Sequence, residues 1–205
     1  LENKIYNRII TLPHKYTLSK LLNNKISNDV FIIIREPIKW YFSYYSYKIK
    51  SKKNNINKNK SFNVFYNEII NAKKNKLNII SWHHPFEKNS VVDEIMSIKN
   101  DNIGFYTKMV IVYISKNRES YYNKKLSDKD ITNIFYDFRL ENIIKIENVK
   151  LINQKFLKNN KNKIDFDYKI NHNPDNKSDS IEKIPDNIIK SIMYYDRIIY
   201  DLFYK

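Results

Sequence analysis

The pattern of apolar and polar residues predicts strands and helices that follow one another along the chain. Val30–Ile34 (VFIII) is apolar on both faces and rich in β-branched residues, which is typical of a buried parallel strand. Pro37 comes soon after and favours the first turn of a helix, where its missing N–H removes no hydrogen bond. In that helix apolar residues recur every three or four positions and predict a stripe that faces the core: Ile38, Phe42, Tyr45 and Ile49.

The rest of the chain continues this alternation. Short apolar runs predict further strands at Arg8–Leu12, Lys108–Ile114 and Asn142–Ile146. Helical periodicity or capping residues predict helices at Thr17–Leu22, from Ser61 to about Ala72, at Asn89–Lys99, from Ser127 to about Leu140, at Lys150–Leu157 and from Pro185 onward, the last with a stripe of Ile188, Ile192, Tyr195, Ile199 and Leu202. Two Lys- and Asn-rich segments read as loops, Lys48–Lys60 and Lys158–Lys163. Strands alternating with helices predict an α/β fold with a largely parallel sheet, in a single domain over residues 1–205.

Composition supports a folded protein with an anionic partner. The chain has 205 residues, 42% hydrophobic and 15% aromatic, which suits one globular domain with a sizeable core. Its formal net charge of +15 suits nucleic acid, an acidic glycan or a phosphorylated small molecule. A coding bias toward Lys, Asn and Ile would produce the same excess of charge without any such partner, and both readings stay open.

Several structural classes are excluded by what the sequence lacks. Without cysteine there is neither a disulfide framework nor a cysteine-based zinc site. No apolar run approaches the roughly 18 residues of a transmembrane helix, and no signal peptide is visible. The sequence begins at Leu1 rather than at Met, which is compatible with a fragment of a longer protein.

Arg35 is the first candidate for binding chemistry. It follows the predicted strand directly, and ligands of parallel α/β folds bind beyond the carboxyl ends of the strands. The next helix begins at the same place, so that its free N–H groups and positive dipole face the same space. An arginine fork beside a helix start suits phosphate, and the hydroxyl of Ser43 lies about two turns into that helix. The alternative is an Arg35 that forms a structural salt bridge and a Ser43 that only packs.

The stretch FIIIREPIKWYFSYYSY resembles the 3′-phosphate-binding motif of sulfotransferases that use 3′-phosphoadenosine 5′-phosphosulfate (PAPS). In that motif an apolar strand is followed by Arg-x-Pro, by a serine eight residues after the arginine, and by aromatic residues. The matching positions are Arg35, Pro37, Ser43, Tyr44 and Tyr45. Three further segments are similar to other elements of the family: IITLPHKYTLSKLL upstream, IIKIENVKLINQKFL downstream, and the stretch from NHNPDNK to the end. The resemblance therefore covers nearly the whole chain.

The resemblance implies a fold and an activity. The fold would be the three-layer architecture of P-loop kinases, with a mostly parallel sheet flanked by helices. The activity would be transfer of a sulfuryl group from PAPS to a hydroxyl, most similar to carbohydrate sulfotransferases, with no metal. Arg35 and Ser43 would bind the 3′-phosphate of PAPS, and His14, 21 residues before Arg35, would be the general base. In the carbohydrate branch that base is often a glutamate, and His14 is equally a plain loop histidine after Pro13.

One family element has no counterpart here. Relatives carry a Lys-x-Gly-x-(Ser/Thr)-(Ser/Thr) loop whose backbone N–H groups and lysine bind the 5′-phosphosulfate. The chain has one glycine, Gly104, which lies far downstream of Arg35. The sequence is therefore expected to be a piece that lacks the upstream loop.

Two further segments are candidates for contacts with substrates. SWHHPF contains Trp82, His83 and His84, which would line the acceptor pocket. No carboxylate stands at the spacing of zinc ligands from these histidines, so no metal site is predicted. In NPDNKSDS, Lys177 and Ser178 would reach the 3′-phosphate. Ordinary packed or solvated loops are the alternative for both segments.

A basic nucleic-acid-binding module is the rival function from another class. It would rest on the charge of +15, the lysine-rich loops and the many tyrosines, which can stack on bases. Most of these tyrosines fall in helical stripes, where core packing explains them, and no nucleic-acid-binding motif is present. A relative of the nucleotide kinases is a third reading, which the Arg–Ser spacing disfavours.

Overall fold

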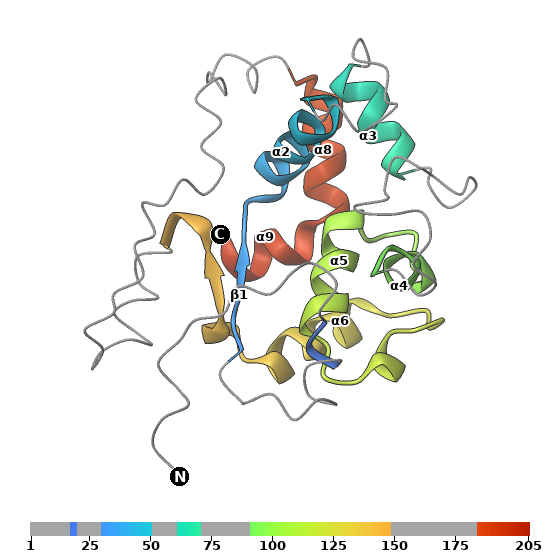
Figure 1. The fold of residues 1–205 in the computed structure, drawn as a ribbon, viewed down its shortest axis with the longest axis vertical. Helices are drawn as coiled ribbons and strands as arrows, with labels where there is room; N and C mark the ends of the chain where they lie inside the picture. The colour runs from blue at the N-terminus through green and yellow to red at the C-terminus, as the bar shows by residue number, and fades with distance from the viewer. Residues whose placement is uncertain (1–16, 20–29, 51–60, 71–90, 149–183) are drawn as a thin grey trace.

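The computed structural model describes residues 17–19, 30–50, 61–70, 91–148 and 184–205, and every structural statement below concerns these residues. Most of them are helical, and a small parallel sheet joins two strands that are far apart in the sequence (Figure 1). Strand β1 is Ile32–Ile34 and strand β2 is Ile143–Lys145, paired in parallel with Ile32 opposite Ile143 and Ile34 opposite Lys145. This architecture is compatible with the α/β class predicted from the sequence.

The helices pack mainly on one another, and the two strands lie to one side of them (Figure 1). They are α2 (Pro37–Lys50), α3 (Phe62–Ile70), α4 (Val91–Ser97), α5 (Phe105–Ile114), α6 (Asp128–Phe138), α8 (Asp186–Tyr195) and α9 (Arg197–Phe203). Figure 1 shows α2, α3 and α8 together at one end of the molecule, with α5 leading from them toward α4 and α6. Three short 3-10 turns complete the described structure at Arg118–Ser120, Leu140–Asn142 and Ile146–Asn148.

Local sequence signals located several elements correctly. Pro37 is the first residue of α2, and β2 lies within the predicted strand Asn142–Ile146. The hydroxyl of Ser61 accepts from the backbone N–H of Val64 at 3.3 Å, as expected of a cap on α3. Ser127 opens α6 with a reciprocal capping box: its hydroxyl accepts from the Asp130 N–H at 3.2 Å, and the Asp130 carboxylate accepts from the Ser127 N–H at 2.8 Å.

The predicted strand Lys108–Ile114 is wrong, because these residues belong to helix α5. Nearly every side chain of α5 is buried, including the charged Lys108, whose amine donates to the carbonyl of Ile98 at 2.9 Å. A helix covered on all sides has a continuous apolar sequence, which periodicity alone cannot distinguish from a buried strand. Burial against the neighbouring helices therefore overrides the β-propensity of the VIV run.

Two helices differ from the sequence prediction in detail. In α2 the predicted stripe of Ile38, Phe42 and Tyr45 is only partly buried, and the deepest face lies one position earlier, at Tyr41 and Tyr44. The single C-terminal helix expected after Pro185 is two helices, α8 and α9, separated at one residue, Asp196. The apolar period continues across the break, so the period gave no sign of it.

The core is strongly aromatic. Several tyrosines are buried to 1% exposure or less, together with two phenylalanines: Tyr41, Tyr66, Tyr106, Tyr121, Phe65 and Phe135. Trp40 stacks on Tyr106 with ring centroids 4.6 Å apart, and Tyr41 meets Tyr66 edge to face at 5.2 Å. Such pairs contribute roughly 0.5–1.5 kcal/mol beyond the burial of their area. Packing between helices thus accounts for these tyrosines without any stacked base.

Candidate functional site

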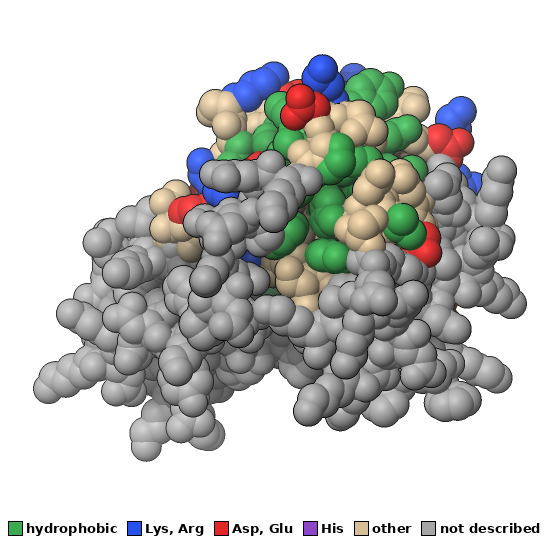
Figure 2. Space-filling model, turned by 90° about the horizontal axis from the view of Figure 1, so that it is seen from above, with side chains coloured by type: hydrophobic (Ala, Val, Ile, Leu, Met, Phe, Trp, Pro, Cys, Tyr) green, Lys and Arg blue, Asp and Glu red, His purple; other side chains and the backbone are tan. Residues whose placement is uncertain are grey.

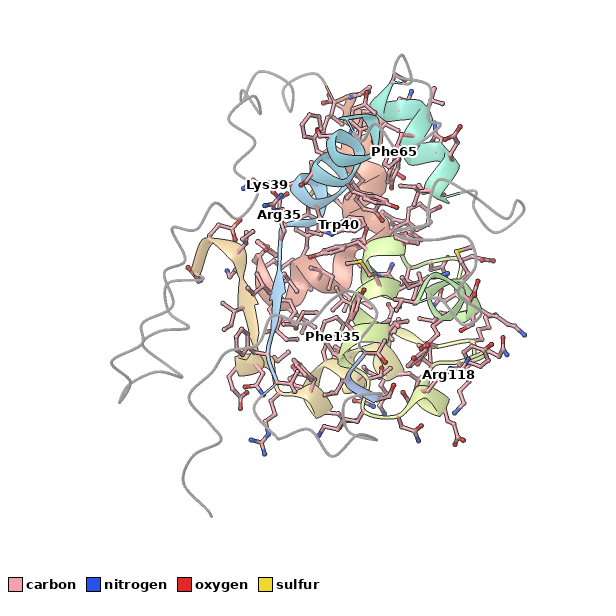
Figure 3. The ribbon with its side chains drawn as sticks, in the orientation of Figure 1. Arg35, Lys39, Trp40, Phe65, Arg118 and Phe135 are labelled. Carbon is pink, nitrogen blue, oxygen red and sulfur yellow. The ribbon has the colours of Figure 1, made fainter. Side chains whose placement is uncertain are left out.

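The candidate site lies at the carboxyl end of the parallel strand pair. Arg35 follows β1 directly, Lys145 is the last residue of β2, and α2 begins two residues after Arg35. Because the strands are parallel, their carboxyl ends meet at one edge, which is where this class of fold places its ligands. Figure 3 shows Arg35 and Lys39 at the junction of β1 and α2, while Trp40 lies toward α5.

Charged side chains gather at this edge. We refer to them as the carboxyl-end cluster, which comprises Arg35, Glu36, Lys39, Lys145 and Glu147. Lys39 contacts Glu36 at 3.5 Å and Glu147 at 3.9 Å. The Lys39 side chain is 53% exposed, so these ion pairs stabilise the fold by little and leave the amine accessible to another anion.

Two tyrosines of α9 and its C-cap lie beside the cluster. Tyr200 donates its hydroxyl to Glu36 at 2.8 Å, and the amine of Lys145 lies 5.1 Å from the ring centre of Tyr204. The hydroxyl of Tyr204 is buried, and it has no hydrogen-bond partner among the described residues. Burial raises the pKa of Tyr204, the carboxylates of Glu147 and Glu36 raise it further, and Arg35 opposes them. Tyr204 is therefore neutral at physiological pH and close enough to Arg35 to sense its charge.

Arg35 and Ser43 are the two predicted site residues within the described structure. Both are partly buried, and neither the Arg35 guanidinium nor the Ser43 hydroxyl forms a hydrogen bond or ion pair with any of the described residues. Lys39 and Ser43 are four residues apart in α2, where positions four apart share a side, and Arg35 lies two residues before this helix begins. The structural salt bridge considered as an alternative for Arg35 is not present in the described part of the chain. An arginine at a strand end, with a lysine and a hydroxyl on the helix that follows, can bind an anion such as phosphate.

The remaining predicted site residues lie outside the described residues. They are His14, Trp82, His83, His84, Lys177 and Ser178. Their roles therefore stay predictions. Among the residues that the structure describes, no group of three or more His, Cys, Asp or Glu side chains is arranged to hold a metal ion.

The backbone of Arg35 is held by a residue that sequence reasoning missed. The hydroxyl of Tyr106, in the first turn of α5, accepts from the Arg35 N–H at 2.9 Å and donates to the Arg35 carbonyl at 2.9 Å. Burial raises the pKa of Tyr106 above its ordinary value, so the hydroxyl keeps its proton. No local signal could have found this contact, because it joins residues 71 positions apart in the sequence.

A second buried contact lies behind the site. Asp196, fully buried between α8 and α9, accepts from the N–H of Thr107 at 2.8 Å and from its hydroxyl at 2.6 Å. No described residue forms a hydrogen bond of good geometry with its other carboxylate oxygen, although the hydroxyl of Tyr41 interacts with this carboxyl and lowers its pKa. Asp196 thus caps the start of α5 from a distant part of the chain, and the residue at the N-cap position itself is Gly104.

The titration of Asp196 makes a prediction about stability. Burial raises the pKa of its carboxyl from 3.8 to about 6, although the bonds from Thr107 oppose the shift. A raised pKa means that the folded state binds this proton more tightly than the unfolded chain, so Asp196 adds stability as pH falls through 6 toward 3.8. Between about pH 7.5 and about pH 4.5 the gain is about 2 kcal/mol.

Chemical denaturation of the parent and of Asp196→Asn across this pH range measures that gain. Asparagine keeps an acceptor for Thr107 but cannot titrate. We expect the difference in free energy of unfolding, parent minus variant, to rise as the pH falls. A difference that stays constant or decreases would show that Asp196 titrates at its ordinary pKa in the folded protein.

The surface seen from the end that carries α2, α3 and α8 is mixed. Among the described residues in Figure 2, hydrophobic side chains occupy the middle of this face, and separate Lys and Arg side chains lie around them rather than in one patch. Val64 of α3 and Met193 and Tyr194 of α8 are about half exposed. The described part of this face therefore does not present the basic stripe expected of a nucleic-acid-binding surface.

Comparison with known proteins adds no relative. No family model matches the chain, and neither the curated proteins nor the solved structures gave a match. Among the described residues no helix has the length and hydropathy needed to cross a membrane, and α2, with 14 residues, falls short of the roughly 20 required.

Proposed function

We propose that the chain is a PAPS-dependent sulfotransferase domain that transfers a sulfuryl group to a hydroxyl of a carbohydrate. The observation that carries this proposal is Arg35: a guanidinium at the carboxyl end of a parallel strand, directly before a helix, without a partner among the described residues. Ser43, two turns along that helix, is available to the same anion. The three-layer, P-loop-kinase-like arrangement of the whole domain belongs to the proposal, since the described sheet has two strands.

Several side chains take part in the proposed reaction. The transferring sulfuryl group passes in line from the phosphate of PAPS to the acceptor oxygen, and cationic groups stabilise the charge that develops on the leaving phosphate. Arg35 and Ser43 bind the 3′-phosphate, with Lys177 and Ser178 as further contacts. His14 removes the proton from the acceptor hydroxyl, and Trp82, His83 and His84 contact the acceptor. The reaction leaves adenosine 3′,5′-bisphosphate and a sulfated product.

Calorimetric titration with adenosine 3′,5′-bisphosphate tests this function. The matched ligand is adenosine 5′-monophosphate, which lacks only the 3′-phosphate that Arg35 is proposed to bind. We expect the bisphosphate to bind at least about tenfold more tightly, since a charge-assisted hydrogen bond of about 1.5–3 kcal/mol corresponds to a factor of this order. Equal affinity for the two nucleotides, or no binding of either, would contradict the proposal.

A nucleic-acid-binding module remains the second candidate because of the net charge of +15. The same titrations with an arbitrary single-stranded oligonucleotide separate the two functions. Tight binding to the oligonucleotide that falls steeply with salt, without binding of the bisphosphate, would favour the second candidate. Selectivity for the 3′-phosphate, without binding of the oligonucleotide, would favour the sulfotransferase.

A further inference from the structure

The junction between β1 and α2 depends on a residue from another element. Arg35 lies after the last residue of β1 and before the first residue of α2. Its N–H and carbonyl are satisfied by one hydroxyl, that of Tyr106, at 2.9 Å in each direction. A hydroxyl has one proton to donate and lone pairs to accept with, so a single group can hold both sides of the residue.

Tyr106 is itself fixed on several sides. Its side chain is 1% exposed, and its ring stacks on Trp40 of α2 with centroids 4.6 Å apart. Its backbone N–H donates to the hydroxyl of Tyr41 at 3.1 Å. The next residue, Thr107, is bound by the buried Asp196. The hydroxyl that meets Arg35 therefore projects from a rigid part of the core rather than from a loop.

We infer that Tyr106 is a positioning residue for anion binding by Arg35: it fixes the backbone from which the guanidinium projects. The inference rests on the proposed function and adds to it a residue that does not touch the ligand. The direction of a side chain follows from the φ and ψ of its residue, and for Arg35 neither the sheet nor the helix fixes both. A charge-assisted, two-pronged contact with phosphate tolerates little misalignment, so a loosened backbone weakens binding while the charge stays present.

The test compares two tyrosines that each lose one buried hydroxyl. Tyr106→Phe removes both bonds to Arg35 and keeps the ring that stacks on Trp40. Tyr66→Phe is the control: Tyr66 is also 1% exposed, and its hydroxyl pairs with that of Ser191 at 3.1 Å instead. We expect both variants to melt at a somewhat lower temperature. Only Tyr106→Phe is expected to weaken the binding of adenosine 3′,5′-bisphosphate, by roughly five- to tenfold.

A double-mutant cycle separates positioning from general loosening. In an Arg35→Ala background, Tyr106→Phe is expected to have no further effect on affinity, because the group that it positions is gone. If both tyrosine variants weaken the binding of the nucleotide equally, Tyr106 is structural only and the proposed function stands. The same holds if the parent binds the nucleotide and neither variant changes its affinity. A parent that does not bind the bisphosphate would overturn the proposed function and this inference together.

A second variant keeps the test informative if Tyr106→Phe does not fold. Tyr41→Phe leaves the Tyr106 hydroxyl in place and removes the acceptor of the Tyr106 N–H, together with a hydroxyl that interacts with the Asp196 carboxylate. We expect this variant to bind the bisphosphate roughly two- to threefold more weakly than the parent. In that case, an affinity equal to that of the parent would overturn the inference.

Discussion

Replacing Gly104 with alanine is expected to lower the free energy of unfolding by about 3–5 kcal/mol, the sum of overpacking and of a lost buried cap. A Cβ at this position would lie 2.5 Å from Cγ and Oδ1 of Asp196, well inside contact distance. The carboxylate cannot simply move aside, because Thr107 binds it through both its N–H and its hydroxyl. The backbone is not the obstacle, since Gly104 has φ −70° and ψ 161°, which alanine adopts without strain.

A double variant identifies the cause of that loss. Asp196→Ala removes the carboxylate, so Gly104→Ala made in the same chain should cost less than about 1 kcal/mol more. Denaturant unfolding of the parent, the two single variants and the double variant gives the four free energies. If Gly104→Ala costs as much with alanine at 196 as with aspartate, the loss does not come from the close approach of the two residues.

Replacing Arg35 with alanine is expected to weaken the binding of adenosine 3′,5′-bisphosphate by roughly ten- to a hundredfold. This factor corresponds to about 1.5–3 kcal/mol for a charge-assisted hydrogen bond to phosphate. The melting temperature should change little, because Arg35 is only partly buried and its guanidinium has no partner among the described residues. Arg35→Lys should restore part of the affinity, since a point charge cannot reproduce the planar fork. Ser43→Ala should cost less, about 0.5–1.5 kcal/mol for one neutral hydrogen bond.

Lys129→Ala serves as the charge control for these variants. Lys129 is an exposed residue of α6, and its replacement removes one positive charge without touching the carboxyl-end cluster. Calorimetric titration beside thermal melting should show an affinity close to that of the parent. If Arg35→Ala behaves like Lys129→Ala, or unfolds, then Arg35 is a structural charge at the end of a strand and the proposed function loses its main support.

The sequence could predict the features that depend on neighbouring residues, but not those that depend on contacts between residues far apart in the chain. Pro37 and Ser127 lie beside the helix ends that they mark, and α2 and α6 begin where they indicate. The α5 helix was missed because its sequence is apolar all round and its cap, Asp196, comes from a segment 89 residues away. The break between α8 and α9 was missed for the same reason, since the buried contact that holds Asp196 has no trace in the local pattern.

The same distinction applies to the candidate site. Arg35, Pro37 and Ser43 lie within nine residues of one another, and a strand followed at once by a helix determines their relative positions. The cluster partners Lys145 and Glu147 come from the second strand and its end, and parallel pairing brings them to the same edge. Tyr106 and Tyr204 reach this edge through packing of the helices, which no spacing in the sequence encodes.

The cap that Asp196 provides also sets an order in which the protein can mature during synthesis. Helix α5 lies in the middle of the core, yet the carboxylate that completes its first turn is made 89 residues after Thr107. While the ribosome is still adding that stretch, the N–H groups at the start of α5 lack this acceptor. The nascent chain should therefore resist proteases around α5 only once α8 and α9 have emerged.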